Sequence, residues 1–584
     1  MNAEALHTFH IPVMGLSFTI DSPIKVAALG ISSAVSIMDD DLIEKMTQFY
    51  SKLFNFSQPE ITVKMQDYRA NRITAYLNLT DKIVRQKFEK LKTELTESRI
   101  ALDHYLAMLP NQSEIRKSLS QLTDKSGLRQ FLDANLKPGT IDVNIMTKLD
   151  KDNFDKKKQL PVELNDAHAA LRGFANSNLE SSVILSAGMN PRLFSYFENF
   201  PDFFPNANGH LKKKVILKVS DFRSAMIQGN FLAKKGIWVS EYRIESGLNC
   251  GGHAFATEGH LLGPILQEFK SRKHELIQSA FDLITKVWTT KAIAFPQNPP
   301  LVKITAQGGI GTSDEHQLLL DHYQIDSIGW GTPFLLVPEA TTVDHQTLEL
   351  LCKAKAEDLF LSNISPLGVP FNTIKGTTND FFKQKRIDSG KAGSACPKKF
   401  LAIHKDANGA GICTASRKFQ QQKIETLELQ NETHSATYQN QIQNITEKAC
   451  LCVGLSNASL LANELPVKGE QQGVIICPGP NLAFFDQQVS LSRMIGHIYG
   501  TDDVSSTTYR PHVFINELKM YVDYFIKNTT TNTDTKIGKP EKFRQNLLEG
   551  IAYYEDLFVR VIQNSEDTLN ELELEKQRLL LHQC

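Results

Sequence analysis

Short apolar runs alternate with segments of helical periodicity in two parts of the chain, residues 10–55 and 166–345. This order of strand, helix, strand and helix with short connections is typical of parallel strands closed into a (β/α)8 barrel. The pattern predicts seven of the eight strands and places the eighth near residues 359–361. The predicted strand starts are Ile11, Ile31, Ser182, Val215, Ile237, Val302 and Ser327.

Two other regions interrupt or follow this alternation. Residues 58–165 read as long, charged, helix-period sequence without strand signals, and residues after about 365 carry six cysteines and strong helical patterns at 513–527 and 540–582. We predict four segments: the first part of the barrel (1–57), a helical insertion (58–165), the remainder of the barrel (166–365), and a mixed, largely helical C-terminal domain (366–584). The insertion could be a lid or a dimer surface, or a solvated excursion without a catalytic role.

The composition of the chain indicates what kind of molecule it binds. The chain has 584 residues, with 64 Lys plus Arg against 65 Asp plus Glu, so it lacks the basic field that collects nucleic acid or anionic membrane. A small-molecule substrate is the expected partner. No run approaches the roughly 20 apolar residues that cross a bilayer. The first ten residues do not resemble a signal peptide, so we expect a cytoplasmic protein whose eight cysteines are thiols or metal ligands.

Three glycine motifs lie at the ends of predicted strands, at residues 247–253, 305–312 and 329–340. A phosphate is held best by several converging backbone N–H groups and a helix N-terminus, which glycine permits because no Cβ intervenes. The loop containing Gly308 and Gly309 precedes a predicted helix, and Gly331 and Thr332 follow the next strand. Either motif alone could be a tight connection, but the two together predict a phosphate site at the barrel mouth.

These motifs also resemble a known family. Cys250-Gly-Gly-His253, Ala306-Gln-Gly-Gly-Ile-Gly311 and Gly331-Thr-Pro-Phe-Leu-Leu-Val-Pro-Glu-Ala340 are similar to the signatures of the nitronate monooxygenase (2-nitropropane dioxygenase) family, a group of FMN-dependent TIM barrels that includes enoyl-thioester reductases. The resemblance covers about half of the chain and is specific only over its last hundred positions. It implies FMN as cofactor, held by Met14 and Gly15 of the opening strand, Gly251 and Gly252 beside the ring or ribityl chain, and Gly308, Gly309, Gly331 and Thr332 at the phosphate.

The resemblance makes His253 a catalytic base or substrate contact, because family members place a histidine after Gly-Gly near the flavin. A histidine that only hydrogen-bonds the loop or packs against His260 is the alternative. Lys218 stands in an otherwise apolar strand, where a charge is costly unless it has a partner. Flavin barrels commonly place such a lysine near N1 and O2 of the ring, and we predict that role for Lys218 unless the side chain points outward.

Four cysteines of the C-terminal region form a candidate metal site, because four thiolates suit a [4Fe–4S] cluster or a structural zinc. Their spacing matches no compact ferredoxin or zinc-ribbon signature, and buried free cysteine is common, so the absence of a metal stays an equal alternative. A cluster would deliver electrons to the flavin in place of NAD(P)H. The four residues are Cys396, Cys413, Cys450 and Cys452.

The predicted function is FMN-dependent oxidation or reduction of a small organic acid, a nitronate or an unsaturated acyl compound. An FMN-dependent enoyl-thioester reductase, or a non-catalytic scaffold that binds a phosphate ligand, is the alternative. Pro333 stands where the resembled family usually has an arginine, which removes a charge and a backbone donor. No Rossmann fingerprint follows an early strand, so NAD(P)H would have to reach the flavin directly. The electron donor and the oligomeric state stay open.

Overall fold

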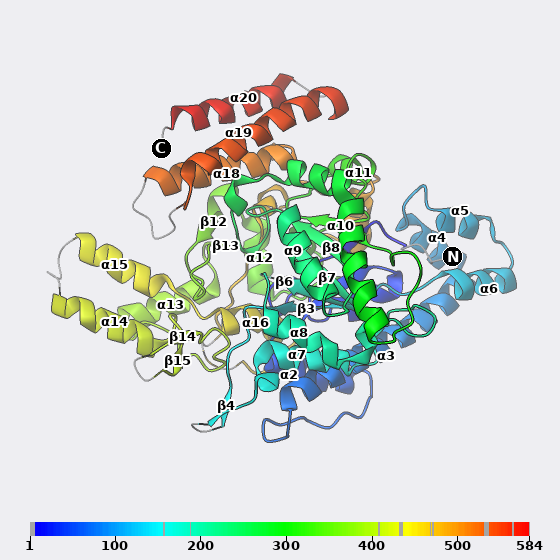
Figure 1. Cartoon of the computed structure of the whole chain (residues 1–584), viewed down its shortest axis with the longest axis horizontal. Coiled ribbons are helices and arrows are strands. Elements are labelled where there is room, and N and C mark those ends of the chain that lie inside the picture. Colours follow the sequence, from blue (N-terminus) through cyan, green and yellow to red (C-terminus); the bar gives the residue numbers. More distant parts are fainter. Residues whose placement is uncertain are drawn as a thin grey trace.

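The computed structural model describes residues 6–155, 158–186, 188–406, 409–430, 436–467, 469, 472–530, 537–562 and 566–582. Its centre is a closed barrel of eight parallel strands in the order β1-β11-β10-β8-β7-β6-β3-β2, which is the TIM barrel that the sequence predicts (Figure 1). The strands are β1 (Phe9–Ile11), β2 (Ser32–Ser36), β3 (Ile141–Met146), β6 (Ser181–Ser186), β7 (Lys213–Val219), β8 (Val239–Glu245), β10 (Lys303–Gln307) and β11 (Ser327–Gly329).

Seven of these strands lie where the sequence predicts them, but the prediction for the eighth is wrong. Residues 359–361 belong to β12 (Leu359–Ser362), which pairs antiparallel with β13 (Phe371–Ile374) outside the barrel. The missing barrel strand is β3, inside the segment predicted as a helical insertion. Its apolar residues alternate with Asp142 and Asn144, which are buried inside the barrel. These polar residues interrupt the kind of apolar run by which the other strands are recognised.

Helices cover the outside of the barrel, and local signals in the sequence fix several of their ends. Helix α2 (Asp40–Leu53) begins where the Asp39 side chain accepts a hydrogen bond from the Leu42 N–H. Helix α7 (Asp166–Ala175) follows Asn165. The others are α1 (Ser22–Val26), α8 (Pro191–Tyr196), α9 (Phe222–Ala233), α10 (Leu262–Thr290), α11 (Ser313–Asp321) and α12 (His345–Lys353).

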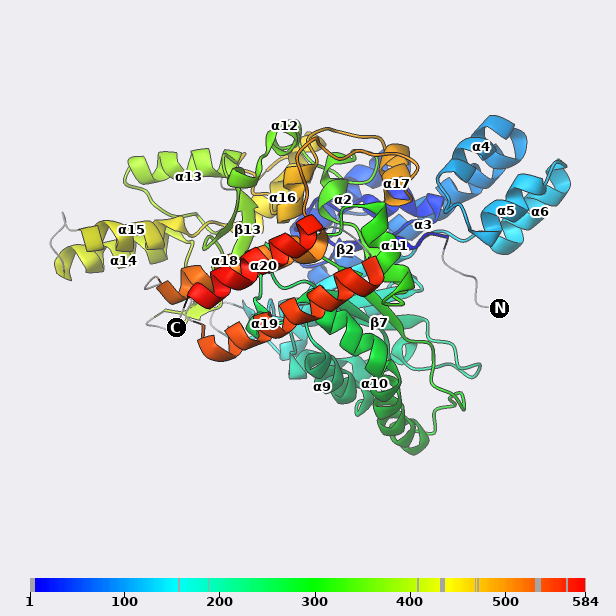
Figure 2. The ribbon, with the colours of Figure 1, turned by 90° about the horizontal axis from the view of Figure 1, so that it is seen from above.

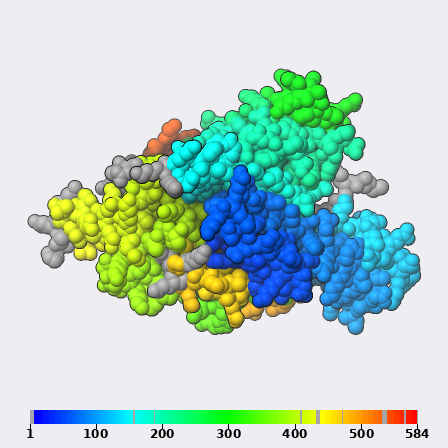
Figure 3. Space-filling model, turned by 90° about the horizontal axis from the view of Figure 1, so that it is seen from below, coloured from blue at the N-terminus to red at the C-terminus, as the bar shows by residue number. Residues whose placement is uncertain are grey.

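The insertion has two parts. Helix α3 (Tyr68–Glu97) packs against α2 and α7 and so belongs to the barrel's outer layer. Helices α4 (Arg99–Ala107), α5 (Glu114–Gln121) and α6 (Lys125–Asn135) form a small separate core together with the second half of α3, and they project from one end of the molecule (Figures 1 and 3). A two-stranded ribbon of β4 (Phe154–Asp155) and β5 (Lys158–Gln159) follows β3.

The C-terminal region shares one continuous hydrophobic core with the barrel. Strand β13 pairs with β9 (Gly252–His253) after the barrel strand β8, and so joins the region to the barrel mouth. Helices α18 and α19 pack against α10, and α20 packs on α18 and α19. Figure 2 also shows a helical arm with α13, α14 and α15. The remaining elements are α13 (Thr378–Asp388), β14 (His404–Lys405), β15 (Gly411–Ile412), α14 (Arg417–Gln430), α15 (Ala436–Glu447), α16 (Leu451–Ala462), α17 (Leu491–Ile498), α18 (Val513–Thr530), α19 (Pro540–Leu557) and α20 (Glu566–Leu581).

In the described part of the chain, no helix combines the length and the apolar character that a membrane span requires.

Candidate functional site

A cavity of about 420 Å³ lies at the carboxyl ends of the barrel strands, where TIM barrels place their active sites. The sequence analysis names one catalytic and nine cofactor-binding residues, and all of them line this cavity. They are Met14, Gly15, Lys218, Gly251, Gly252, His253, Gly308, Gly309, Gly331 and Thr332. The fold thus brings together residues that lie up to 318 positions apart, while their individual roles remain predictions.

The outer wall of the cavity comes from the C-terminal region, which the sequence analysis did not connect with the site. This wall is largely apolar, which a cavity that holds only a polar cofactor would not require. Its residues are Phe371, Phe400, Leu401, Leu451, Cys452, Leu455, Cys477 and Asn481. No local motif in the sequence marks these residues, because only the tertiary fold brings them to the cavity.

The loop after β10 has the conformation expected of a phosphate cradle. Gly308 and Gly309 have φ angles of +118° and +85°, a backbone conformation that residues with a Cβ rarely adopt. A Cβ on Gly309 would lie 2.0 Å from Nδ2 of Asn249, so this position has no room for a side chain. Helix α11 starts directly after the loop, and the Thr312 side chain caps it by accepting a hydrogen bond from the Glu315 N–H. The helix N-terminus adds partial positive charge beside the loop.

Gly331 and Thr332 line the same cavity from the next strand, but Gly331 is less constrained. Its φ is −102°, and a Cβ there would meet Pro12 Cγ at 3.3 Å. The Thr332 hydroxyl accepts a hydrogen bond from the Gly479 N–H at 3.0 Å, which ties this turn to the C-terminal wall.

Three side chains that line the cavity carry buried polar atoms for which the described residues offer no hydrogen-bond partner. They are Asn144 through Oδ1, Asn249 through both amide atoms, and Gln307 through Oε1. Buried polar atoms are rarely left unsatisfied in folded proteins. The set therefore indicates a polar ligand that presents both donors and acceptors.

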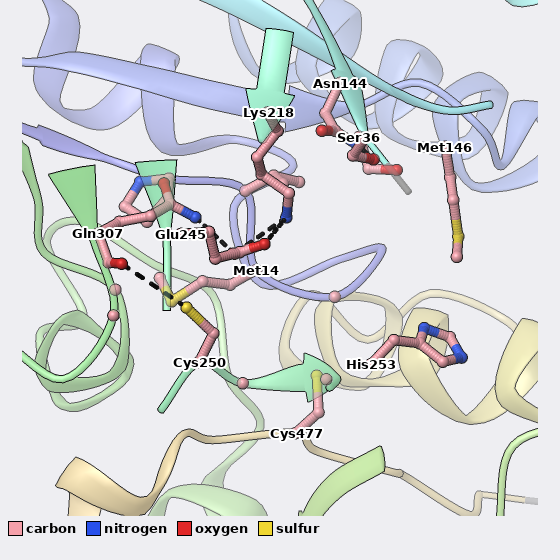
Figure 4. A pocket seen from close by; sticks show the side chains of 18 of the residues that line it. Met14, Ser36, Asn144, Met146, Lys218, Glu245, Cys250, His253, Gln307 and Cys477 are labelled. Carbon is pink, nitrogen blue, oxygen red and sulfur yellow. Dashed lines mark hydrogen bonds and ion pairs between the residues drawn. The ribbon is translucent and has the colours of Figure 1, made fainter. Parts of the chain in front are cut away.

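Lys218 points into the cavity, which decides against the outward alternative (Figure 4). Its ammonium group lies 2.7 Å from a carboxylate oxygen of Glu245, and Gln307 donates a hydrogen bond to the same carboxylate at 2.7 Å. The partner that a charged residue needs in this barrel is thus Glu245, the last residue of β8. The sequence analysis overlooked Glu245 because no glycine motif contains it.

His253 is held at the cavity wall rather than against His260. Its Nε2 lies 2.7 Å from the Ser365 hydroxyl, and its ring meets that of Phe371 edge-on at 5.0 Å. Burial, together with the nearby charges of Lys148 and Lys218, lowers the pKa of His253 to about 4. The imidazole is therefore neutral at physiological pH and has a lone pair with which to accept a proton.

The predicted metal site at Cys396, Cys413, Cys450 and Cys452 is not supported, and this prediction is corrected. All four cysteines are buried, but the described residues contain no group of three or more His, Cys, Asp or Glu side chains arranged to hold a metal ion. The thiols instead pair by hydrogen bonds, Cys396 with Cys413 and Cys450 with Cys452. This pairing, together with burial, raises the pKa of Cys413 and Cys452.

The sequence matches no known family model and no curated protein. Among solved structures, the chain is similar to FabK from Thermotoga maritima (11% identity, TM-score 0.30, covering 71% of this chain and 85% of that one). It is also similar to the enoyl reductase domain of MlnA from Bacillus amyloliquefaciens (16%, 0.32, 76% and 89%). A third similar structure is nitroalkane oxidase from Streptomyces ansochromogenes (11%, 0.30, 65% and 85%). Similarity at this level does not indicate a function, so the function is inferred from the cavity.

Proposed function

We propose that the chain is an FMN-dependent oxidoreductase. The observation that carries this proposal is the cradle at Gly308 and Gly309, which opens at the start of α11 into a cavity lined by side chains with polar atoms that no described residue hydrogen-bonds. A cofactor with a phosphate tail and a polar ring system fits both features. The phosphate would lie on Gly308, Gly309, Gly331 and Thr332, with Asn249 beside it and Asn144 and Gln307 available to the ring.

The chain's own residues divide the remaining work. FMN, when bound, supplies reversible transfer of an electron pair to or from the substrate. Lys218 would offset negative charge on the ring, and Glu245 fixes the position of its ammonium group. His253, neutral and hydrogen-bonded to Ser365, would take up the proton that accompanies the change in the substrate.

The apolar wall favours one of the candidate substrate classes. Phe400, Leu401, Leu451 and Leu455 face the cavity, and such a surface suits an unsaturated acyl chain better than a small nitronate. We therefore keep enoyl-thioester reduction as the second candidate activity. NAD(P)H oxidation that requires an enoyl thioester would support it, whereas oxygen consumption that requires a nitronate would support the monooxygenase.

Flavin binding tests the proposal directly. The purified full-length chain, titrated with FMN, is expected to bind one equivalent and to quench its fluorescence. A protein that binds no FMN, either as purified or after titration, would refute the oxidoreductase and leave the non-catalytic scaffold.

Replacing His253 by alanine is expected to leave FMN affinity unchanged and to lower kcat by about a hundredfold, because general acid–base catalysis contributes that order of rate. The pH profile of the wild type should show no protonation of His253 between about pH 5 and 8, since its pKa lies near 4. The matched control is His260→Ala, at an exposed histidine seven residues away. Undiminished turnover in His253→Ala would return His253 to a structural role.

A further inference from the structure

Three consecutive carbonyl groups of the loop after β10 are held by side chains from the C-terminal region. Arg510 Nη2 donates to the Gly309 carbonyl at 2.6 Å, and Asn481 Nδ2 donates to the Ile310 carbonyl at 3.1 Å. His497 Nε2 lies 2.9 Å from the Gly311 carbonyl, while its Nδ1 accepts the Val504 N–H. That second bond fixes the tautomer in which Nε2 is the donor.

These side chains also bind one another through Glu315, the third residue of α11. Arg510 forms an ion pair with Glu315, in which both side chains are buried, and its Nε donates to Asn481 Oδ1 at 2.9 Å. The Glu315 carboxylate accepts in addition the N–H groups of Gly311 and Val513. Burial raises the pKa of Glu315, but Arg510, His512 and the Gly311 N–H together hold it below its ordinary value, so the carboxylate stays charged. We name Arg510, Asn481, His497 and Glu315 the loop clasp.

The clasp orients the peptide groups of the loop. In a planar peptide, the C=O of one residue and the N–H of the next point in opposite directions. Because the Gly309 carbonyl turns toward Arg510, the Ile310 N–H points away from Arg510, and Ile310 itself lines the cavity. Arg510 does not line the cavity, so it acts on the loop and not on a ligand. A loop rich in glycine is otherwise costly to hold in one conformation.

We propose that the loop clasp is a set of positioning residues that give the barrel its affinity for a phosphate group. The inference rests on the proposed FMN function and extends it. The C-terminal region, far from the glycine motif in sequence, would hold the loop in the conformation that binds a phosphate. The clasp holds the loop through its three carbonyl groups.

Comparing FMN with riboflavin, which lacks the phosphate, tests this proposal. The paired variant Glu315→Gln/Arg510→Met removes the ion pair without leaving a buried charge alone. Asn481→Ala removes the two bonds of that amide, to the Ile310 carbonyl and from Arg510 Nε. We expect both to weaken FMN binding, the first by about tenfold or more, and to change riboflavin binding by less than about threefold. Arg493→Met is the matched control, since Arg493 pairs with Asp502 at the surface of the same segment.

The outcomes separate the two proposals. A wild type that binds no FMN overturns the proposed function together with the clasp. A wild type that binds FMN, with variants that bind it equally well, overturns the clasp alone. Variants that lose FMN and riboflavin to the same extent also overturn it, because general damage to the fold affects both ligands.

Discussion

Replacing Gly309 by valine is expected to abolish FMN binding. Gly309 has a φ of +85°, and a Cβ there would lie 2.0 Å from Nδ2 of the buried Asn249. The left-handed backbone costs a residue with a Cβ roughly 1–2 kcal/mol. The collision costs more, because it moves Asn249 or the loop and so displaces the amides that would hold the phosphate. Fluorescence titration with FMN would measure the loss.

Gly390→Val is the matched control for this prediction. Gly390 has a φ of +69° but no heavy atom within 4 Å of the Cβ position, so the substitution carries the backbone cost alone. It should leave FMN affinity unchanged. If Gly309→Val binds FMN as the wild type does, the phosphate assignment is wrong.

Gly331→Ala should have a much smaller effect on FMN affinity than Gly309→Val. The two glycine motifs look equivalent in the sequence, and only the structure separates them. Gly331 has negative φ, and the nearest atom to its Cβ position lies at 3.3 Å. The same titration compares the two variants. Loss of FMN in Gly331→Ala would show that the second turn tolerates no side chain near the phosphate.

The barrel could be predicted from the sequence because its signal is local and repeated. Seven strands are apolar runs followed by small residues and a helix, and each needs only about a dozen residues to be recognised. The sequence-based prediction missed strand β3 because its apolar run is interrupted by Asp142 and Asn144, which face the barrel interior. Strand β3 also follows some 70 residues of helical sequence, which separate it along the chain from the predicted strands.

The site was predictable to the same extent and for the same reason. Glycine motifs reveal the backbone of the cradle, but Glu245 and the loop clasp lie outside them, and Asn249 was not singled out within its motif. Arg510 meets Gly309 across 201 positions of sequence, a contact that no periodicity encodes. The cysteines show the opposite error, since residue type suggested a metal site where the fold provides paired, buried thiols.

Glu517 should make the stability of the folded chain fall as pH rises toward neutrality. It is buried in α18, where its carboxylate accepts hydrogen bonds from the Ser246 hydroxyl and from the Leu262 N–H. Burial outweighs both bonds and raises the pKa of Glu517 from 4.5 to about 7. Between these values the folded chain binds more protons than the unfolded chain, so the free energy of unfolding decreases as pH rises. The full shift corresponds to about 3 kcal/mol, lost between about pH 4.5 and 7 and not regained above it.

Glu517→Gln should remove this dependence, because the amide keeps the size of the side chain and carries no charge to desolvate. Urea unfolding of the wild type and the variant on both sides of neutrality would show the variant gaining stability relative to the wild type as pH rises. Glu549→Gln, at an exposed glutamate, is the control and should leave the wild-type slope intact. Parallel slopes for wild type and Glu517→Gln would mean that Glu517 is ionised throughout. Its bond to Ser246, next to the cavity-lining Glu245, would then join the C-terminal helices to the site through a fixed charge.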